Sequence, residues 1–374
     1  GIAEAEAVQR LQLQQEVTAL ATELRGESDP AFGGIWIEHA PVFKIVVAFA
    51  DQKDRQALRE SIAPNLRRYV QIIHRPRSDR DISAQLDQLT AAISAANIPY
   101  TSGYTVQAGK FFVAVESREH AQQVRALIPP ALRGDVEVRV EPIPRPQQTV
   151  TGVQPGDYIY AGFMHYQNNN PVTPGCTWAY AVRYGSSNLP GILTASHCPG
   201  AFYYNGHWIN LGTPVVNKND PNTKYDYKVH ATTGLTQGPW VYFEDKNSIP
   251  EFPASGYFKV TGTLGYHGQT VGMVMCKSGR VTGITCGEIT HGWYTYNGAK
   301  GWIEVGNTKQ ADLSDGGDSG GPWFVYPGTS TNITAVGIHT AGTPDCTGPT
   351  CKAVYMPIDY IDDHIPVSVV LGAP

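Results

Sequence analysis

The chain contains Gly317-Asp318-Ser319-Gly320-Gly321-Pro322, a glycine-rich turn around one serine, and this stretch decides how the whole sequence is interpreted. Upstream, Thr194-Ala195-Ser196-His197-Cys198 places a histidine beside a cysteine that can anchor its loop. A serine hydroxyl becomes an effective nucleophile only when a positioned base takes its proton. The two stretches therefore predict Ser319 as nucleophile, His197 as general base, and the N–H groups of Gly317 and Ser319 as an oxyanion hole.

A carboxylate that orients the histidine should lie between these two stretches if the order is His, Asp, Ser. The candidates are Asp220, Asp226, Asp245 and Asp312. Asp226 is flanked by tyrosines and begins an apolar/polar alternation typical of a strand, whereas Asp220 lies in a Lys-Asn-Asp-Pro-Asn turn. We expect Asp226 to be the third member, with Asp220 as the fallback.

Bulk composition excludes several classes of protein. The 374 residues are 41% hydrophobic and 16% charged, with a net charge of −5, which predicts globular domains and gives no basic stripe for nucleic acid. No apolar run approaches the ~18 residues of a membrane helix. The chain begins at Gly1 without a charged and then apolar leader, so we expect a signal peptide to be absent or already removed. We expect no metal and no organic cofactor.

All six cysteines lie between residues 176 and 351, and an even, clustered set is typical of an oxidising, extracellular compartment. The spacings suggest three local bridges, although sequence alone permits fifteen connectivities. A zinc site is the alternative, but no CxxC or HxxxH spacing supports it. The suggested pairs are Cys176–Cys198, Cys276–Cys286 and Cys346–Cys351.

The first half of the chain, residues 1–148, has helical spacing that the second half lacks. Apolar residues recur at Leu13, Val17, Leu20 and Leu24 before Gly26, and again at Ile82, Leu86, Leu89 and Ile93. Residues 141–146, Glu-Pro-Ile-Pro-Arg-Pro, predict an extended linker.

An internal repeat lies within this half. Residues 44–76 align without a gap on residues 110–142, an offset of 110 − 44 = 66, with 11 of 33 positions identical. Each copy reads strand, helix, strand. The half is therefore predicted to hold two small α+β subdomains.

Residues 149–374 are rich in short alternating runs separated by turns, which predicts an all-β domain such as a pair of barrels. The sequence Gly317-Asp318-Ser319-Gly320-Gly321 also fits the nucleophile elbow of an α/β-hydrolase. That fold would need strand-turn-helix around Ser319 and long alternating helices, and neither pattern appears.

Four stretches resemble the chymotrypsin-like serine endopeptidases, specifically the bacterial branch of α-lytic protease and the streptogrisins. They are Cys176 to Cys198 closing at the histidine, Cys276-Lys277-Ser278-Gly279 to Cys286-Gly287, residues 317–322, and Val336-Gly337-Ile338-His339-Thr340-Ala341-Gly342. The resemblance implies a double β-barrel. It also implies that the first half is a pro-region that assists folding and inhibits the protease, with cleavage near Gln148–Gly152.

Two departures from this family bear on the specificity pocket, for which the resemblance implies Ser314, His339, Thr340 and Gly342. Residues 313–316 contain no cysteine before the nucleophile. His339 is similar to the histidine of glutamyl endopeptidases, which implies a preference for Glu or Asp at P1, although a histidine that merely narrows an apolar pocket is the alternative. In relatives a hydroxyl matching Thr340 bonds the triad carboxylate, so we expect a Thr340–Asp226 hydrogen bond.

The expected function is a secreted serine endopeptidase in pro-enzyme form that acts on polypeptides, has its own pro-region as intramolecular partner, and binds neither nucleic acid nor membrane. Two rivals stay open: a catalytically latent binding protein whose first half permanently blocks the cleft, and a serine esterase.

Overall fold

The computed structural model of the chain describes most of its length. The described residues are 2–26, 29–145, 165–167, 176–198, 202–204, 209–219, 223–234, 237–249, 252–296, 298–310, 312–328, 330–344 and 346–373. They form two compact units. The first comprises Gly1–Ile143, His267–Met273 and Ile289–Gly301, and the second comprises Pro144–Tyr266, Val274–Glu288 and Trp302–Pro374. The predicted boundary at 148/149 and the expected cleavage site lie outside the described residues.

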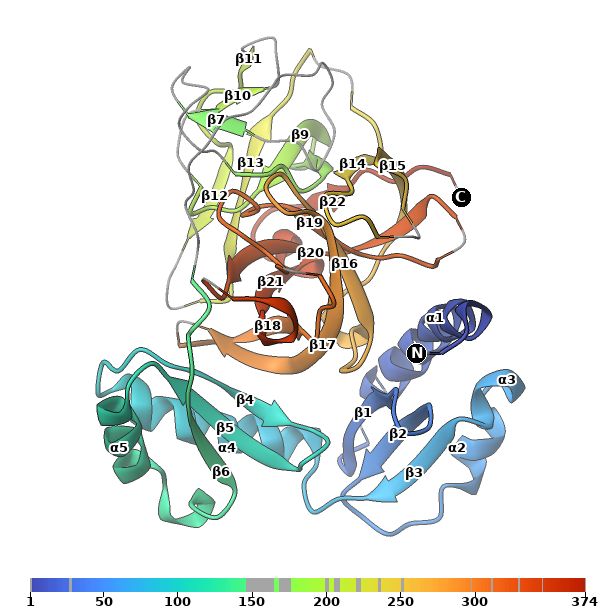
Figure 1. The fold of residues 1–374 in the computed structure, drawn as a ribbon, viewed down its shortest axis with the longest axis vertical. Coiled ribbons are helices and arrows are strands. Elements are labelled where there is room, and N and C mark those ends of the chain that lie inside the picture. Colours follow the sequence, from blue (N-terminus) through green and yellow to red (C-terminus); the bar gives the residue numbers. More distant parts are fainter. Residues whose placement is uncertain are drawn as a thin grey trace. The chain divides into compact units, whose positions relative to one another are not determined.

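The first unit is α+β (Figure 1). Its helices are α1 (Glu4–Gly26), α2 (Gln56–Ser61), α3 (Pro64–Arg67), α4 (Asp79–Ser94), α5 (Arg118–Leu127) and the short η1 (Pro130–Leu132). Two three-stranded arrays run in the orders β1-β2-β3 and β4-β5-β6. Their strands are β1 (Phe32–Glu38), β2 (Lys44–Phe49), β3 (Val70–His74), β4 (Thr101–Thr105), β5 (Lys110–Val115) and β6 (Val136–Val140).

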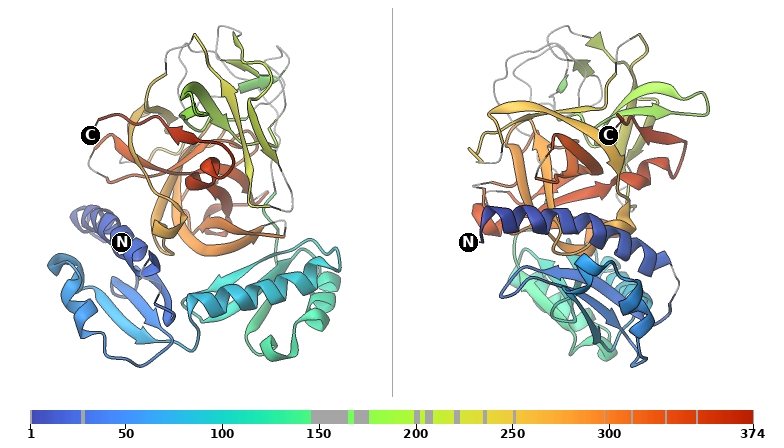
Figure 2. Two further views of the ribbon diagram at one scale, coloured as in Figure 1. Left: turned by 180° about the vertical axis from the view of Figure 1, so that it is seen from behind. Right: turned by 90° about the vertical axis from the view of Figure 1, so that its right-hand side faces the viewer.

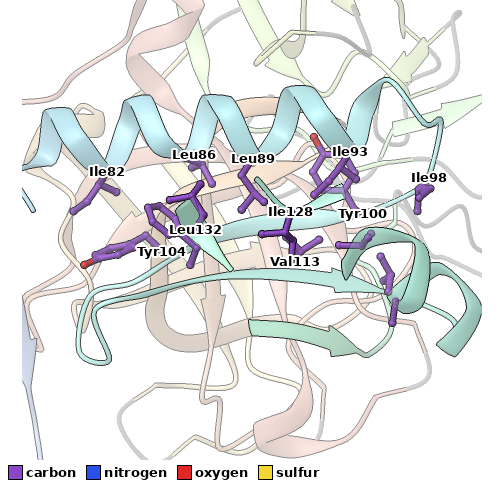
Figure 3. Packing of buried hydrophobic residues seen from close by; sticks show 14 residues of the cluster. Ile82, Leu86, Leu89, Ile93, Ile98, Tyr100, Tyr104, Val113, Ile128 and Leu132 are labelled. Carbon is purple, nitrogen blue, oxygen red and sulfur yellow. The ribbon is translucent and has the colours of Figure 1, made fainter. Parts of the chain in front are cut away.

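Both helices predicted from apolar spacing are confirmed. Helix α1 ends at Gly26 and, deep blue in Figure 2, lies along the sheet β1-β2-β3. Helix α4 begins with a capping box, in which Ser78 and Asp81 exchange hydrogen bonds between side chain and backbone. Its apolar row, Ile82, Leu86, Leu89 and Ile93, is buried against β4 and β5, as Figure 3 shows.

The internal repeat corresponds to a repeated order of elements. Strands β2 and β3 begin at residues 44 and 70, and β5 and β6 begin at residues 110 and 136, which is 66 residues later in both cases. Both pairs, β2–β3 and β5–β6, are parallel. Between them the first copy has α2 and α3, and the second has α5 and η1.

The second unit contains a closed ring of strands, shown in orange to red in Figure 1. The strands pair in the cyclic order β16-β17-β18-β21-β20-β19 and back to β16. They are β16 (Val274–Gly279), β17 (Gly283–Tyr296), β18 (Ala299–Gly306), β19 (Pro322–Val325), β20 (Asn332–Gly342) and β21 (Ala353–Pro357). The outer ends of β17 and β18 belong to the first unit, where β17 pairs with β4. Strands β14 (Trp240–Glu244) and β15 (Ser255–Thr263) continue the sheet from β20.

A second sheet has the order β12-β13-β9-β8-β22 among the described residues. Its strands are β8 (Ala181–Tyr184), β9 (Leu189–Thr194), β12 (Val216–Asn219), β13 (Asp226–Ala231) and β22 (Val367–Val369), and a small sheet joins β7 (His165–Gln167), β10 (Phe202–Tyr204) and β11 (Ile209–Asn210). Short 3-10 turns η2 (Tyr266–Gly268), η3 (Gly348–Thr350) and η4 (Ile358–Asp362) complete the elements.

The expected fold class, an α+β first half followed by an all-β, chymotrypsin-like second half, is confirmed. The three suggested disulfides are also present: Cys176–Cys198, Cys276–Cys286 and Cys346–Cys351. Among the described residues, no helix combines the length and the apolar character that crossing a membrane requires.

Candidate active site

Asp226 and His197 meet at the start of β13. The Oδ2 atom of Asp226 lies 2.8 Å from His197 Nδ1, while Oδ1 accepts hydrogen bonds from the backbone N–H of His197 at 3.1 Å and from Ser196. Both the N–H and the hydroxyl of Ser196 donate at 2.9 Å. Because a carboxylate on Nδ1 holds the proton there, the lone pair of the neutral imidazole is on Nε2.

The charge of this carboxylate is stabilised in place. Burial by itself raises the pKa of Asp226, but the adjacent His197 and the hydrogen bonds from His197 and Ser196 outweigh it and lower the pKa to about 2. Asp226 is therefore ionised throughout the neutral range and stabilises positive charge on the imidazole of His197.

The turn that carries His197 is held from two sides. Asp226 accepts from its N–H groups, and the buried Lys228, two residues further along β13, donates from Nζ to the carbonyl of Cys198. Burial lowers the pKa of Lys228 to about 8, although the charge of Asp226 opposes that shift. The disulfide Cys176–Cys198 anchors the same turn.

Ser319 lies next to this turn through its backbone. Its carbonyl accepts a hydrogen bond from the N–H of Thr177 at 2.7 Å and lies 3.8 Å from Cys198 Sγ. The Nε2 atom of His197 is buried and has no hydrogen-bond partner within the described part of the chain. The structure therefore shows no hydrogen bond between Ser319 Oγ and His197 Nε2. Hydrogen bonds between a nucleophile and its base are often long before substrate binds.

The turn around Ser319 presents two N–H groups without acceptors. Gly316, Asp318, Gly320 and Gly321 each donate their backbone N–H within the protein. The N–H groups of Gly317 and Ser319 donate to no acceptor among the residues that the structure describes. Two unpaired donors beside a serine hydroxyl suit a developing oxyanion.

A buried ion pair fixes this turn from below, and sequence reasoning missed it. Both side chains of Asp318 and Lys277 are fully buried, and Lys277 Nζ lies 2.6 Å from Asp318 Oδ2. Asp318 also accepts from the hydroxyl and N–H of Thr282 and the N–H of Val281. Burial raises the pKa of Asp318, but the charge of Lys277 and the hydrogen bonds from Lys277 and Thr282 outweigh it and lower the pKa to about 2. The Cys-Lys-Ser-Gly motif contained the signal, since a lysine inside a strand of a barrel needs a partner.

The other carboxylate candidates lie elsewhere. Asp245 caps its own turn by accepting from Asn247 and Ile249, and Asp312 accepts from the N–H of Ser314. Asp220 lies outside the described residues. Of the described candidates, Asp226 is the one that contacts His197.

The residues expected in the specificity pocket are buried near the same turn. The backbone of His339 bonds to Gly320 at 2.7 Å and to Gly321 at 2.8 Å, which fixes β20 against the nucleophile turn. A Cβ on Gly342 would lie 1.9 Å from Ser314 Oγ, so these two residues are in close contact. Ser314 Oγ is buried without a partner among the described residues.

The expected Thr340–Asp226 hydrogen bond is wrong for this structure. The hydroxyl of Thr340 is buried and has no partner among the described residues. The hydroxyl of Ser196 takes its place on Asp226 Oδ1, because it lies in the turn that the carboxylate already caps.

The side chain of His339 is a hydrogen-bond acceptor on one side. Trp323 Nε1 donates to its Nδ1 at 3.2 Å, and burial, with the charge of Lys277, lowers the pKa of His339 to about 3. An indole is only a donor, so the neutral imidazole carries its proton on Nε2.

Arg145, in the predicted linker, lies against the end of β20. Arg145 and Gly342 exchange two backbone hydrogen bonds, of 3.0 and 3.2 Å, as an antiparallel bridge. An extended segment therefore pairs with the end of β20 that the resemblance assigns to substrate binding.

Comparisons with known proteins agree with these observations. No known family profile matches the chain. The chain is 23% identical to "Serine protease 1" of Rarobacter faecitabidus over 99% of its own length, and it spans 62% of that relative. It is 29% identical to "Serine protease 2" of Streptomyces fradiae over 47% of its own length and 91% of the relative.

Among solved structures, the chain is similar to Thermobifida fusca Protease A, with 24% identity, a TM-score of 0.40, and coverage of 58% of this chain and 100% of that one. The curated relatives confirm the resemblance to serine proteases that the motifs implied, since both are named serine proteases.

Proposed function

We propose that the protein is a serine endopeptidase in pro-enzyme form. The observation that carries the proposal is the hydrogen-bonded pair Asp226–His197 beside the turn of Ser319. In that turn the N–H groups of Gly317 and Ser319 have no acceptor among the described residues. Ser319 Oγ attacks the scissile carbonyl carbon while its proton passes to His197 Nε2. The carbonyl oxygen becomes the oxyanion, which the N–H groups of Gly317 and Ser319 stabilise.

Collapse of the tetrahedral intermediate breaks the C–N bond, and the leaving amine takes the proton from Nε2. A water molecule then attacks the acyl-enzyme, again giving a proton to His197, and Ser319 is regenerated with release of the acid. Asp226, ionised because its pKa is about 2, stabilises the imidazolium in both halves of the cycle. Every proton moves among Ser319, His197, substrate and water.

We also propose that residues 1–148 are the pro-region, which assists folding and inhibits the protease as an intramolecular partner. The Arg145–Gly342 pairing supports this, because a strand bound at the end of β20 competes with an extended substrate. Cleavage in the segment 148–152 would then be needed for full activity. We infer that the protein is secreted, because its three disulfides would persist in an oxidising compartment.

For the P1 side chain we propose an acidic residue, Glu or Asp. The Nε2–H of His339 supplies a donor, and a bound carboxylate would favour a proton on the imidazole. Ser314 offers a second hydrogen-bond donor, because its hydroxyl is buried and has no partner among the described residues. Peptides that differ only at P1 test this, and equal or faster cleavage after Leu or Ala than after Glu would contradict it.

The decisive experiment is labelling with a fluorophosphonate before and after limited proteolysis of the linker. We expect weak labelling of the intact chain, stoichiometric labelling after cleavage, and none in Ser319→Ala. Hydrolysis of matched amide and ester substrates follows, and we expect kcat for the amide to fall roughly 10⁶-fold in Ser319→Ala.

A catalytically latent binding protein is the second candidate, and the same Arg145–Gly342 pairing favours it. That candidate predicts no labelling under any proteolysis. Hydrolysis of esters without amides would instead indicate an esterase.

A further inference from the structure

We propose that the module containing the first copy of the repeat is a second, separate docking site for the protease half, residues 149–374, and that it binds the segment His267–Met273. This rests on the proposed function, because it specifies how the pro-region holds the protease. The first module is defined here as residues 4–74 and the second as residues 79–140. All contacts below lie within the first compact unit, to which His267–Met273 belongs.

The docking edge is β1, the outer strand of the sheet β1-β2-β3. Trp36 forms a parallel bridge with Val271, and the N–H of Ile37 donates to the carbonyl of Val271 at 2.9 Å. Edge strands present unpaired backbone groups, so an extended segment can add to them as a further strand. Trp36, Ile37 and Val271 are 1%, 2% and 6% exposed, so the contact excludes water.

Side chains at both ends of this contact form hydrogen bonds with backbone carbonyl groups of the segment His267–Met273. His39 Nε2 lies 2.7 Å from the carbonyl oxygen of Gly272, beyond the end of β1. Arg25, in the last turn of α1, donates to the carbonyl of His267 and lies 3.5 Å from that of Gln269. The module therefore binds backbone carbonyl groups along this segment, from the 3-10 turn η2 to Gly272, with Val271 as the residue that pairs with β1.

Gly272 shows how closely the two backbones approach. Its φ is +87°, and a Cβ at this position would lie 2.3 Å from the carbonyl oxygen of Ile37. A side chain here would strain the backbone and also push β1 away. The segment is thus shaped for contact with this edge.

The second module uses the equivalent strand on a different segment. Val47 and Val113 are equivalent positions of the repeat, since 47 + 66 = 113. The partner of Val47 is Ile35 in β1, and the partner of Val113 is Ser102 in β4, so β1 and β4 occupy equivalent places in the two modules, just before each copy of the repeat. Ser102 and Thr101 pair antiparallel with Thr295 and Tyr296 of β17.

Each module therefore presents its first strand, β1 or β4, to a separate segment of the protease half. Because the modules are covalently linked, the second contact forms at a high effective concentration once the first exists. Two sites that share no residue can also be broken one at a time, which makes the proposal testable.

The test uses the full chain with Ser319→Ala and amide hydrogen exchange followed by mass spectrometry. Gly272→Ala blocks the β1 contact, and Gly234→Ala is the matched control, with a φ of +84° and nothing within 4 Å of the added Cβ. We expect peptides covering 32–39 and 267–273 to exchange at least about tenfold faster in Gly272→Ala only. Peptides covering 101–105 and 289–296 should be unchanged.

Unchanged exchange at residues 32–39, or an equal increase at 101–105, would overturn the proposal. His39→Ala provides a milder variant should Gly272→Ala misfold, with His74→Ala, at an exposed position of β3, as its control. We expect a smaller increase at 267–273 in His39→Ala and none in His74→Ala, and equal exchange in the two would also overturn it. Amide hydrogen exchange does not depend on catalysis. If fluorophosphonate failed to label the wild-type protein, the proposed function would be refuted, but the exchange result would still test the docking site.

Discussion

At the residue scale, the site is organised around one carboxylate that receives four hydrogen bonds. Asp226 caps the backbone of Ser196 and His197 with Oδ1 and holds the imidazole with Oδ2. Its two oxygens therefore have separate tasks, one in building the turn and one in selecting the tautomer. A change that keeps the shape but reverses a donor and an acceptor separates these tasks.

Asp226→Asn makes that change. An amide nitrogen facing Nδ1 favours the tautomer with its proton on Nε2, which cannot then accept the Ser319 proton, so we expect kcat to fall about 10⁴-fold. The measurement is kcat on a peptide amide after linker cleavage, with Asp245→Asn, which changes only a local turn, as the control. A loss below tenfold would refute the role given to Asp226.

The buried histidines predict how stability depends on pH. Burial lowers the pKa of His339 to about 3 and that of His230 to about 4, both below their ordinary value of 6.5. Below pH 6.5 the unfolded chain therefore takes up protons that the folded chain does not. The stability that these residues contribute is complete above pH 6.5 and is lost as the pH falls towards the folded values.

We expect the free energy of unfolding to fall by up to roughly 1.4 kcal/mol per pH unit for each histidine between pH 6 and pH 4. For His230 the fall should be about half of that near pH 4, where its folded form is also partly protonated. Urea unfolding of Ser319→Ala across this range measures it. Adding His339→Gln should reduce this slope by the contribution of one histidine, relative to a Ser319→Ala chain that carries the surface substitution His74→Gln as control. An identical slope in all three chains would contradict the assignment.

The sequence predicted some of the side-chain hydrogen bonds and ion pairs at the site and missed others. Asp226 could be predicted because flanking tyrosines and the following alternation marked a buried strand start. The error at Thr340 has a local cause: Ser196 lies in the same turn as His197 and reaches the carboxylate first. The lysine inside a predicted strand indicated that Lys277 needs a partner. The identity of that partner, Asp318, 41 residues away, depends on how β16 packs against the turn of Ser319 and could not be predicted from the local sequence.

At the element scale, the nucleophile turn is packed too closely to admit a side chain at Gly320. A Cβ there would lie 2.2 Å from Thr194 Oγ1 and 2.4 Å from the carbonyl oxygen of Thr177, at a φ of +83°. The same contacts join the turn of Ser319 to the strand that leads to His197. Close packing at this point therefore sets the distance between the turn of Ser319 and the turn of His197, the proposed nucleophile and base.

Gly320→Ala should displace that turn. We expect kcat/KM to fall at least 100-fold, since small misplacements of reacting groups cost about this much. Gly185→Ala, with a φ of +69° and open space around the added Cβ, controls for backbone strain alone. Equal activity in the two variants would show that the turn tolerates the displacement.

Elements differ in how well sequence predicts them. Helices α1 and α4 followed from apolar spacing, because each buries one continuous row against its own sheet. The gapless repeat likewise predicted the strands β2, β3, β5 and β6. The contact of β1 with Val271 could not be predicted, because it depends on backbone groups that every residue carries.

At the scale of the whole molecule, covalent cross-links are confined to one part of the chain. All three disulfides join residues between 176 and 351, at separations of 22, 10 and 5. None involves residues 1–148, which contain no cysteine. If the chain is cleaved near residue 150, as proposed, only non-covalent contacts hold the first half.

Short disulfide loops also give little help to folding. The ring of strands closes only when β16 and β19 meet, as Cys276 pairs with Phe324 and Lys277 with Trp323, and such non-local pairing slows folding. A first half that holds β17 through β4 would organise one side of this ring before closure. Removing it should therefore change the folding rate more than the final structure.

We expect the Ser319→Ala chain lacking residues 1–148 to refold from urea at least roughly 100-fold more slowly than the full-length Ser319→Ala chain. Recovery of tryptophan fluorescence gives the rate, with disulfides kept oxidised in both. The shortened chain can still reach the native structure but lacks the half that speeds its folding. Residues 1–148 added as a separate chain should therefore restore fast folding, at a rate that rises with their concentration. Equal rates with and without residues 1–148 would show that the first half inhibits the protease without assisting its folding.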